Sequence, residues 1–157
     1  MRISIEKRIF MDCPEGFHEL TDEEKKEMNF SPDEKIMAIS DPARRIIIAV
    51  AWAQISPLNA FLLGRREISW NMSRQIEKKL KKFSFVWLAD VKRDISGMLA
   101  RGMDYEYVAN RVHMSCESLV IKSEEDLYYF HMYASKVRRD ESLEIFHEIL
   151  DNVVISE

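Results

Sequence analysis

The stretch of residues 115–135 constrains the fold of this chain more than any other part of the sequence. Two segments rich in β-branched and aromatic residues, 117–122 and 127–134, lie on either side of the polar run 123–126. This pattern predicts an antiparallel hairpin with a short loop. A meander of strands built around such a hairpin is a scaffold, and a scaffold by itself indicates no particular chemistry.

Alternation within residues 127–134 gives the last predicted strand two different faces. One face carries Tyr129, His131 and Tyr133. If a helix covers this face, the three rings belong to the core, which is the interpretation we favour. If no helix covers it, they form an aromatic wall that can hold a peptide or a small ligand. The other face carries four apolar or aromatic residues: Tyr128, Phe130, Met132 and Ala134.

The same periodicity rules divide the rest of the chain into strands and helices. The pattern predicts one α+β domain of residues 1–157, in which a single mostly antiparallel sheet of about seven strands is flanked by helices in a layered sandwich. Further strands are predicted at 3–11, 36–40, 44–54, 85–92 and 103–109, and helices at 22–28, 58–63, 66–83 and 139–153.

Glycine, proline and a capping pattern indicate where several of these elements begin and end. Thr21 with Glu24 three residues later forms a capping box in sequence, which predicts a helix start. The dipeptide Asp41-Pro42 predicts a hairpin turn. Gly97 and Gly102 each indicate a turn or a bulge.

Composition excludes some classes of protein. The 157 residues are 46% apolar and 32% charged, which is ordinary for a globular protein. The formal net charge of −4 argues against nucleic acid as the main partner. The longest apolar run, 46–53, is too short to span a bilayer, and residues 1–12 do not resemble a secretory signal. We therefore expect a cytoplasmic protein with Cys13 and Cys116 as free thiols.

The sequence contains no recognisable catalytic or metal-binding pattern. The four histidines occur singly, and Glu144 with His147 forms an E-x-x-H pair without the second pair that a di-iron site needs. The chain has no nucleophile elbow and no glycine-rich phosphate loop. Cys116 is more typical of a small buried residue than of a nucleophile paired with a histidine. We expect no enzyme activity, no cofactor and no metal.

The predicted helix 66–83 carries both a buried stripe and a basic cluster. A solvated helix end explains the cluster, although an acidic partner or a membrane surface would also suit it. Trp70 lies off the buried stripe, on the same side as Arg74. We expect the segment 58–63 to cover Trp70; an exposed Trp70 would instead be a docking anchor. The basic residues are Arg65, Arg66, Arg74, Lys78, Lys79, Lys81 and Lys82.

The element order, with a few short patterns, resembles the Mog/PsbP-like superfamily, and within it small uncharacterised bacterial proteins. The resemblance implies an antiparallel sheet between helices, an α/β/α sandwich. Members include a Ran-GTPase-binding import factor, an extrinsic photosystem II subunit and bacterial chaperones of secreted effectors, so it also implies protein binding. It transfers no binding residue. The matching patterns are 14–17, the hairpin at 41–42, the strands at 102–107 and 128–130, and the closing helix.

These observations favour a non-catalytic, cytoplasmic protein-interaction module, an adaptor or chaperone for another protein. The alternative is a small-ligand-binding protein that uses Tyr129, His131 and Tyr133; the least favoured hypothesis is a hydrolase with a cysteine or histidine. The candidate partner-binding residues are Trp70, Arg74, Tyr129, His131 and Tyr133. The regular spacing of apolar residues further predicts that the core uses them fully and leaves no reactive cluster, such as three or more convergent ionisable groups lining a deep cleft.

Overall fold

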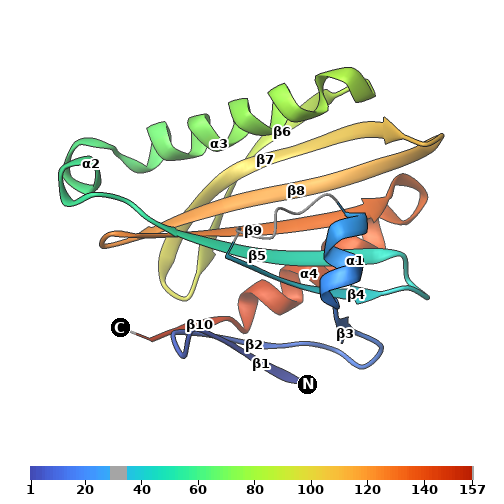
Figure 1. Cartoon of the computed structure of the whole chain (residues 1–157), viewed down its shortest axis with the longest axis horizontal. Coiled ribbons are helices and arrows are strands. Elements are labelled where there is room, and N and C mark those ends of the chain that lie inside the picture. Colours follow the sequence, from blue (N-terminus) through green and yellow to red (C-terminus); the bar gives the residue numbers. More distant parts are fainter. Residues whose placement is uncertain (29–34, 157) are drawn as a thin grey trace.

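A seven-stranded antiparallel sheet forms the centre of the molecule, in the strand order β3-β4-β5-β9-β8-β7-β6 (Figure 1). The computed structural model describes residues 1–28 and 35–156. The predicted α+β class and the predicted antiparallel sheet are both confirmed. The strands are β3 (His18–Glu19), β4 (Ile36–Asp41), β5 (Ile46–Gln54), β6 (Val86–Ile95), β7 (Met98–Ala109), β8 (Val112–Ser123) and β9 (Asp126–Ser135).

The hairpin predicted within residues 115–135 is the pair β8 and β9. Its register places Ser118 opposite His131, and Ser123 opposite Asp126 at the closing end. Glu124, in the two-residue turn, has a φ of 55°. Left-handed turn residues match the natural twist of the strands, which explains why so short a loop closes this hairpin.

The N-terminal strand predicted at 3–11 is wrong. The structure contains two strands there, β1 (Arg2–Ile5) and β2 (Ile9–Asp12), which pair with each other as a hairpin. Glu6 and Lys7 form the turn with φ values of 50° and 58°. The apolar alternation continues across this turn, so the period alone does not show it. With β10 (Val154–Ile155), the two strands form a separate three-stranded sheet.

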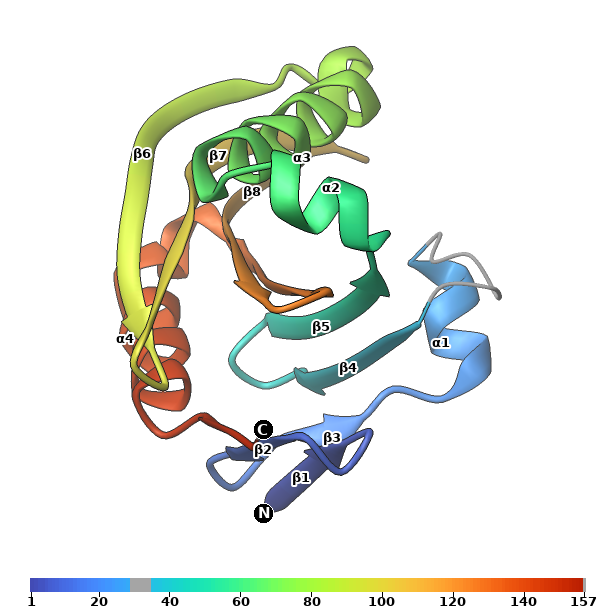
Figure 2. The same cartoon turned by 90° about the vertical axis from the view of Figure 1, so that its left-hand side faces the viewer.

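Two long helices lie on opposite faces of the large sheet (Figure 2). The first, α3 (Arg65–Leu80), continues into the short 3-10 helix η1 (Lys81–Phe83) and packs on β7 and β8. The second, α4 (Arg139–Asp151), follows the 3-10 helix η2 (Lys136–Arg138) and contacts β9, β6 and β2.

Two shorter helices complete the fold. The capping box predicted at Thr21 begins α1 (Asp22–Glu27): the Thr21 hydroxyl accepts from the Glu24 amide at 3.2 Å, and the Glu24 carboxylate accepts from the Thr21 amide. Ser56 caps α2 (Pro57–Leu62) in a similar way, accepting from the Asn59 amide at 3.1 Å. Among the described residues, no helix is long and apolar enough to cross a membrane.

The main core lies between the large sheet, α4 and the three-stranded sheet. Phe146 of α4 is fully buried among Phe130 of β9, Ile48 of β5 and Ile9 of β2. The apolar face predicted for residues 127–134 is thus confirmed as core. On the opposite face, only a narrow stripe of α3 is buried, where Ile68 packs in one cluster with residues of β8 and β9.

Gly102 lies in the middle of β7 and marks neither a turn nor a bulge. The turn is at Gly97, whose φ of 79° joins β6 to β7. A β-carbon on Gly102 would lie 1.7 Å from the backbone carbonyl oxygen of Ser118 on β8. This residue is a glycine because the neighbouring strand approaches too closely for any side chain.

We therefore expect Gly102→Ala to lower the free energy of unfolding by about 1–3 kcal/mol or more, since β7 and β8 must separate to admit a methyl group. Urea denaturation followed by circular dichroism measures this. Gly97→Asn is the matched control: its added atoms meet open space and asparagine tolerates a positive φ, so we expect a change below about 1 kcal/mol. Equal stability of Gly102→Ala and wild type would contradict the close approach of the two strands.

Candidate interaction groove

A groove of about 650 Å³ runs between α3 and the strands β6 and β7. It exists because α3 packs on β7 and β8 through a narrow stripe, while the edge strand β6 continues past the helix without being covered. Figure 1 shows α3 above this end of the sheet. The residues that matter for its chemistry are Arg66, Trp70 and Arg74 on α3, and Trp87, Lys92 and Arg101 on the strands.

Trp70 lines the groove and is 59% exposed, so the predicted cover by residues 58–63 is wrong. That segment forms α2, which precedes α3 in the chain. Its own Leu58 and Phe61 are exposed, Phe61 by 87%. Trp70 is therefore exposed, which is the condition under which the sequence predicts a docking anchor at this position. The guanidinium carbon of Arg74, one helical turn later, lies 4.8 Å from the centre of the Trp70 ring in a cation–π contact.

Trp87 is a second exposed aromatic residue in the groove, and it is absent from the residues that the sequence predicted for partner binding. It lies on the edge strand β6 and is 53% exposed, and its indole nitrogen donates to Asp90 at 3.2 Å. The pairing of β6 with β7 shifts register between Trp87 and Ala89. Its position on an edge strand could not be read from the alternating pattern at 85–92, because alternation does not show which strand of a sheet is outermost.

The polypeptide around the groove is strongly basic. Residues 57–83, which form α2, α3 and η1, contain seven Lys or Arg and two Glu, a net +5 in a chain of net −4, which leaves −9 for the rest. In the strand wall of the groove, the Nε of Arg101 is shielded from solvent and has no hydrogen-bond partner among the described residues. An unsatisfied buried donor costs about 1–3 kcal/mol.

The aromatic face predicted on β9 is a separate place. Tyr129, His131 and Tyr133 are half-buried and stack in a ladder, with ring centres 6.3 Å and 6.0 Å apart. Tyr129 packs in one cluster with Ile68 of α3, and Tyr133 packs in another cluster with Leu80 of the same helix. The helix α3 covers the three rings only in part. They are therefore neither fully buried core residues nor a fully exposed aromatic wall. None of them lines the groove that contains Trp70 and Arg74.

His131 has a polar partner inside the sheet. Its Nδ1 lies 2.7 Å from the hydroxyl of Ser118, which in turn lies 2.9 Å from the hydroxyl of Tyr105. Burial, with a smaller contribution from Lys79, lowers the pKa of His131 to about 4. A neutral imidazole at one end of this chain of hydrogen bonds supports the packing of the sheet.

The buried thiol of Cys116 argues against the cysteine-hydrolase hypothesis. Burial raises the pKa of Cys116 well above its usual value, so the thiolate that a nucleophile requires is not formed near neutral pH. In the part of the chain that the structure describes, Cys116 makes no hydrogen bond with a histidine, and no group of three or more His, Cys, Asp or Glu side chains could hold a metal ion. Cys13 and Cys116 are both free thiols.

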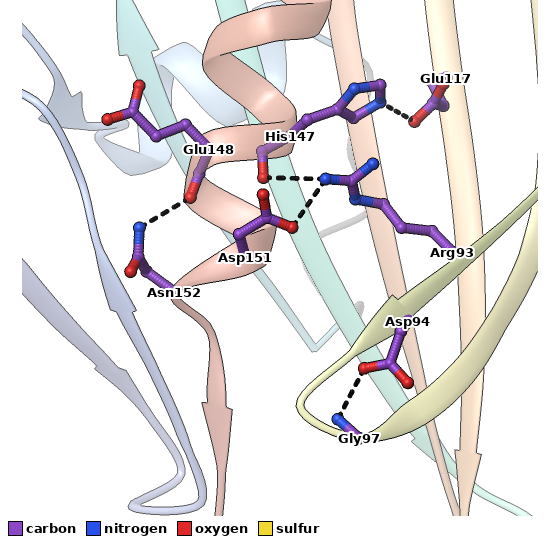
Figure 3. Close-up of polar contacts among 8 residues, drawn as sticks. All are labelled: Arg93, Asp94, Gly97, Glu117, His147, Glu148, Asp151 and Asn152. Carbon is purple, nitrogen blue, oxygen red and sulfur yellow. Dashed lines mark hydrogen bonds and ion pairs between the residues drawn. The ribbon is translucent and has the colours of Figure 1, made fainter.

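A cluster of ionisable side chains, which the sequence did not predict, lies beneath α4 (Figure 3). The buried Glu117 of β8 accepts a hydrogen bond from Nε2 of His147 at 2.8 Å. Arg93 of β6 donates to the carboxylate of Asp151 at 2.7 Å and to the carbonyl of His147 at 3.4 Å. Asp104 of β7 is the cross-strand neighbour of Glu117. The cluster holds α4 against the sheet and was missed because its members come from four distant elements.

The two neighbouring carboxyl groups titrate in opposite directions. Burial, together with the hydrogen bond to Glu117 and its charge, raises the pKa of Asp104 to about 8. Burial alone would also raise the pKa of Glu117, but hydrogen bonds from His147 and Asp104 outweigh it and lower that pKa. Asp104 therefore holds the proton at neutral pH, and Glu117 carries the charge. Glu144, the other half of the E-x-x-H pair, is exposed and takes no part.

Comparison with known proteins places the fold. No protein-family model matches the chain, and no curated protein matches it significantly. Among solved structures, cyanobacterial PsbP (CyanoP) from Synechocystis superposes with a TM-score of 0.72 over 99% of this chain and 91% of its own, at 14% identity. The fold is PsbP-like. At this identity the similarity establishes the fold alone.

Two further structures agree with the PsbP-like fold. PA94, a protein of unknown function from Pseudomonas aeruginosa, has a TM-score of 0.59 at 15% identity, covering 81% of this chain and 87% of its own. LpqN of Mycobacterium tuberculosis, which is involved in cell envelope biogenesis, has a TM-score of 0.59 at 14% identity, covering 95% and 83%. The superfamily resemblance inferred from the sequence is thus confirmed at the level of the fold.

The protonated state of Asp104 makes stability depend on pH. Its pKa rises from 3.8 to about 8 on folding, so between these values the folded state holds a proton that the unfolded chain has released. The unfolding free energy that depends on Asp104 therefore falls as pH rises from about 4 to 8. We expect Asp104→Asn to decline less steeply than wild type between pH 5 and 8, measured by urea denaturation at each pH. The exposed Asp12→Asn is the control and should parallel wild type; identical slopes for wild type and Asp104→Asn would refute this assignment.

Proposed function

We propose that this chain is a non-catalytic, cytoplasmic protein-interaction module of one domain, an adaptor or chaperone, which binds an acidic partner protein on the face formed by α2, α3, η1 and β6. The observation that carries the proposal is the coincidence of a net +5 charge with exposed aromatic and aliphatic side chains on one side of an otherwise acidic molecule. The exposed apolar residues there are Leu58, Phe61, Leu62, Trp70, Phe83, Val86 and Trp87.

Helix stability explains only part of the positive charge. Lys78 and Lys79 lie in the last turn of α3, where the helix dipole favours cations. Arg65 and Arg66 lie in the first turn, where the dipole disfavours them, and Glu67 is the one acidic residue there. A feature that opposes local stability needs a different reason, and attraction of an acidic partner supplies one.

The mixture of residues favours a protein as the partner. Interface centres are enriched in tryptophan, tyrosine and arginine, and truncation of such residues removes most of the binding energy. The groove presents Trp70 with Arg74 stacked on it, and Trp87 on the opposite wall. The remaining surface is net negative, which disfavours the wide phosphate contact that nucleic acids require.

The other parts of the proposal have separate support. The high pKa and burial of Cys116 support a non-catalytic role. Two unpaired cysteines support a reducing compartment such as the cytoplasm. The PsbP-like neighbour LpqN is involved in cell envelope biogenesis, and the role proposed for this chain does not depend on sharing that location. For the small-ligand alternative, the bond of His131 to Ser118 and the packing of α3 beside Tyr129 and Tyr133 leave less free surface.

Replacing both groove tryptophans tests this proposal. We expect Trp70→Ala/Trp87→Ala to reduce cross-linked capture of a specific partner at least about 10-fold, because each hot-spot truncation removes at least about 2 kcal/mol of binding energy. The measurement is quantitative mass spectrometry of cross-linked native lysate, which also identifies the cross-linked segment of the partner.

The control is Val137→Ala, which truncates an even more exposed apolar side chain on η2, away from the groove. It should capture the partner as well as wild type. Equal capture by wild type and the double variant, a cross-linked segment that is basic, or a wild-type protein that stays monodisperse and captures nothing would each contradict the proposal.

A further inference from the structure

The strand wall of the groove contains a cationic pair that the fold does not need. Lys92 of β6 lies directly opposite Arg101 of β7 in the antiparallel ladder, and both line the groove. Like charges in directly opposed positions destabilise a hairpin. Neither side chain has an ion pair among the described residues, and the Nε of Arg101 is shielded from water without an acceptor. These two cations lack the counter-charge that would justify their position.

The helix wall repeats the same chemistry at regular intervals. Arg66, Trp70 and Arg74 are spaced by four residues and therefore form one line along α3, with successive side chains about 6 Å apart. All three are exposed and line the groove. Neither arginine has an ion pair among the described residues; the partner of Arg74 is the ring of Trp70. The helix therefore presents a cation, an aromatic ring and a cation in a row.

The carboxylates of the groove do not neutralise these cations. Glu77 and Asp90 also line it, and Asp90 already accepts a hydrogen bond from Trp87. Four cations against two carboxylates leave the groove with an excess of positive charge and two exposed indole rings. Its volume of about 650 Å³ lies within the usual range for a binding site that encloses a short segment or a small molecule.

An extended peptide matches the spacing of this wall. Alternate residues of an extended chain lie on the same side and are about 6.6 Å apart, close to the 6 Å between successive members of the line on α3. We propose that the groove binds an extended segment of the partner in which two carboxylate residues lie two positions before and two positions after an apolar residue. The carboxylates meet Arg66 and Arg74, the apolar residue packs on Trp70, and the backbone or a further carboxylate meets Lys92 and Arg101. This inference rests on the proposed function and specifies the partner segment.

The test uses the full chain and a synthetic capped peptide with the order glutamate, serine, leucine, serine, glutamate. Isothermal titration calorimetry at low salt should show saturable binding, because the peptide supplies the missing counter-charges. A peptide of the same composition with the two glutamates adjacent should bind at least 5-fold more weakly, and a peptide with lysines in place of the glutamates should not bind. Equal affinity for any two of these three peptides would overturn the spacing or the charge on which the proposal depends.

Charge-neutralising variants identify the groove as the binding place. Arg101→Gln and Arg66→Gln should each lower the affinity for the glutamate-serine-leucine-serine-glutamate peptide at least 10-fold. Lys26→Gln, the same charge change on the exposed side of α1, should keep an affinity within 2-fold of wild type. Arg101→Lys, which retains the charge, should recover part of the loss. Circular dichroism verifies that each variant is folded. If neither Arg101→Gln nor Arg66→Gln weakens binding, the peptide binds elsewhere and the proposal fails.

Stability supplies a second readout that needs no ligand. If Lys92 and Arg101 repel each other without compensation, Lys92→Gln should raise the melting temperature of the free protein. The same variant should lower its affinity for the peptide. A lower melting temperature would show that Lys92 has a stabilising partner, which contradicts the proposal. A single-stranded decathymidylate that displaces the peptide at lower concentration than the free peptide itself would also overturn it, in favour of a nucleic acid.

The two proposals fail in different ways. If the peptide does not bind but the tryptophan double variant still loses its captured partner, the interaction face stands and the carboxylate spacing is wrong. If the peptide binds the groove but partner capture does not depend on Trp70 and Trp87, the groove is a peptide site without the adaptor role on this face.

Discussion

The pairing of β8 with β9 is the contact on which both packing layers depend, because its two faces belong to different layers. Phe130 and Met132 of β9 lie in the core beneath α4. His131, between them in sequence, faces the other side and bonds to Ser118 of β8. A shift of one residue in this register would exchange the two sets, so that aliphatic residues would meet α3 and the stacked rings would enter the core.

The two long helices are held against this sheet in different ways. The helix α4 uses an apolar stripe around Phe146 and a polar contact from His147 to the buried Glu117, which stays charged while Asp104 holds the proton. The helix α3 is anchored by few buried residues, chiefly Ile68 and Met72. Its outer face is therefore free to carry charge and exposed rings. The groove follows from this asymmetry: a helix held by a narrow stripe beside an uncovered edge strand leaves a gap between them.

The proposed binding role of the groove accounts for residues that oppose local stability. Arg65 and Arg66 lie at the wrong end of a helix dipole, and Lys92 lies opposite Arg101 in a strand pair. Each is mildly unfavourable for folding, and three of them, Arg66, Lys92 and Arg101, line the same groove. Natural proteins retain such unfavourable groups mainly at functional sites, which agrees with the binding role proposed for this groove.

Local sequence determined most of the secondary structure and one face of the core. The hairpin of β8 and β9, the capping box at Thr21, the apolar face around Phe130 and the PsbP-like order of elements follow from periods and turn residues that act over a few positions. The sequence did not predict the turn at Glu6, and it wrongly predicted a turn or bulge at Gly102. An alternating pattern shows neither a reversal of the chain nor the closeness of a neighbouring strand.

Tertiary structure alone decided which polar and aromatic residues meet. Trp70 is exposed because α2 turns away from α3, and Trp87 matters because β6 is the outermost strand. Glu117 and His147 are hydrogen-bonded although they are 30 positions apart in the chain, and only the docking of α4 brings them together. Side-chain periodicity describes how each element divides into an inner and an outer face, but neighbours across elements depend on the order of the strands and the placement of the helices, which no short-range pattern encodes.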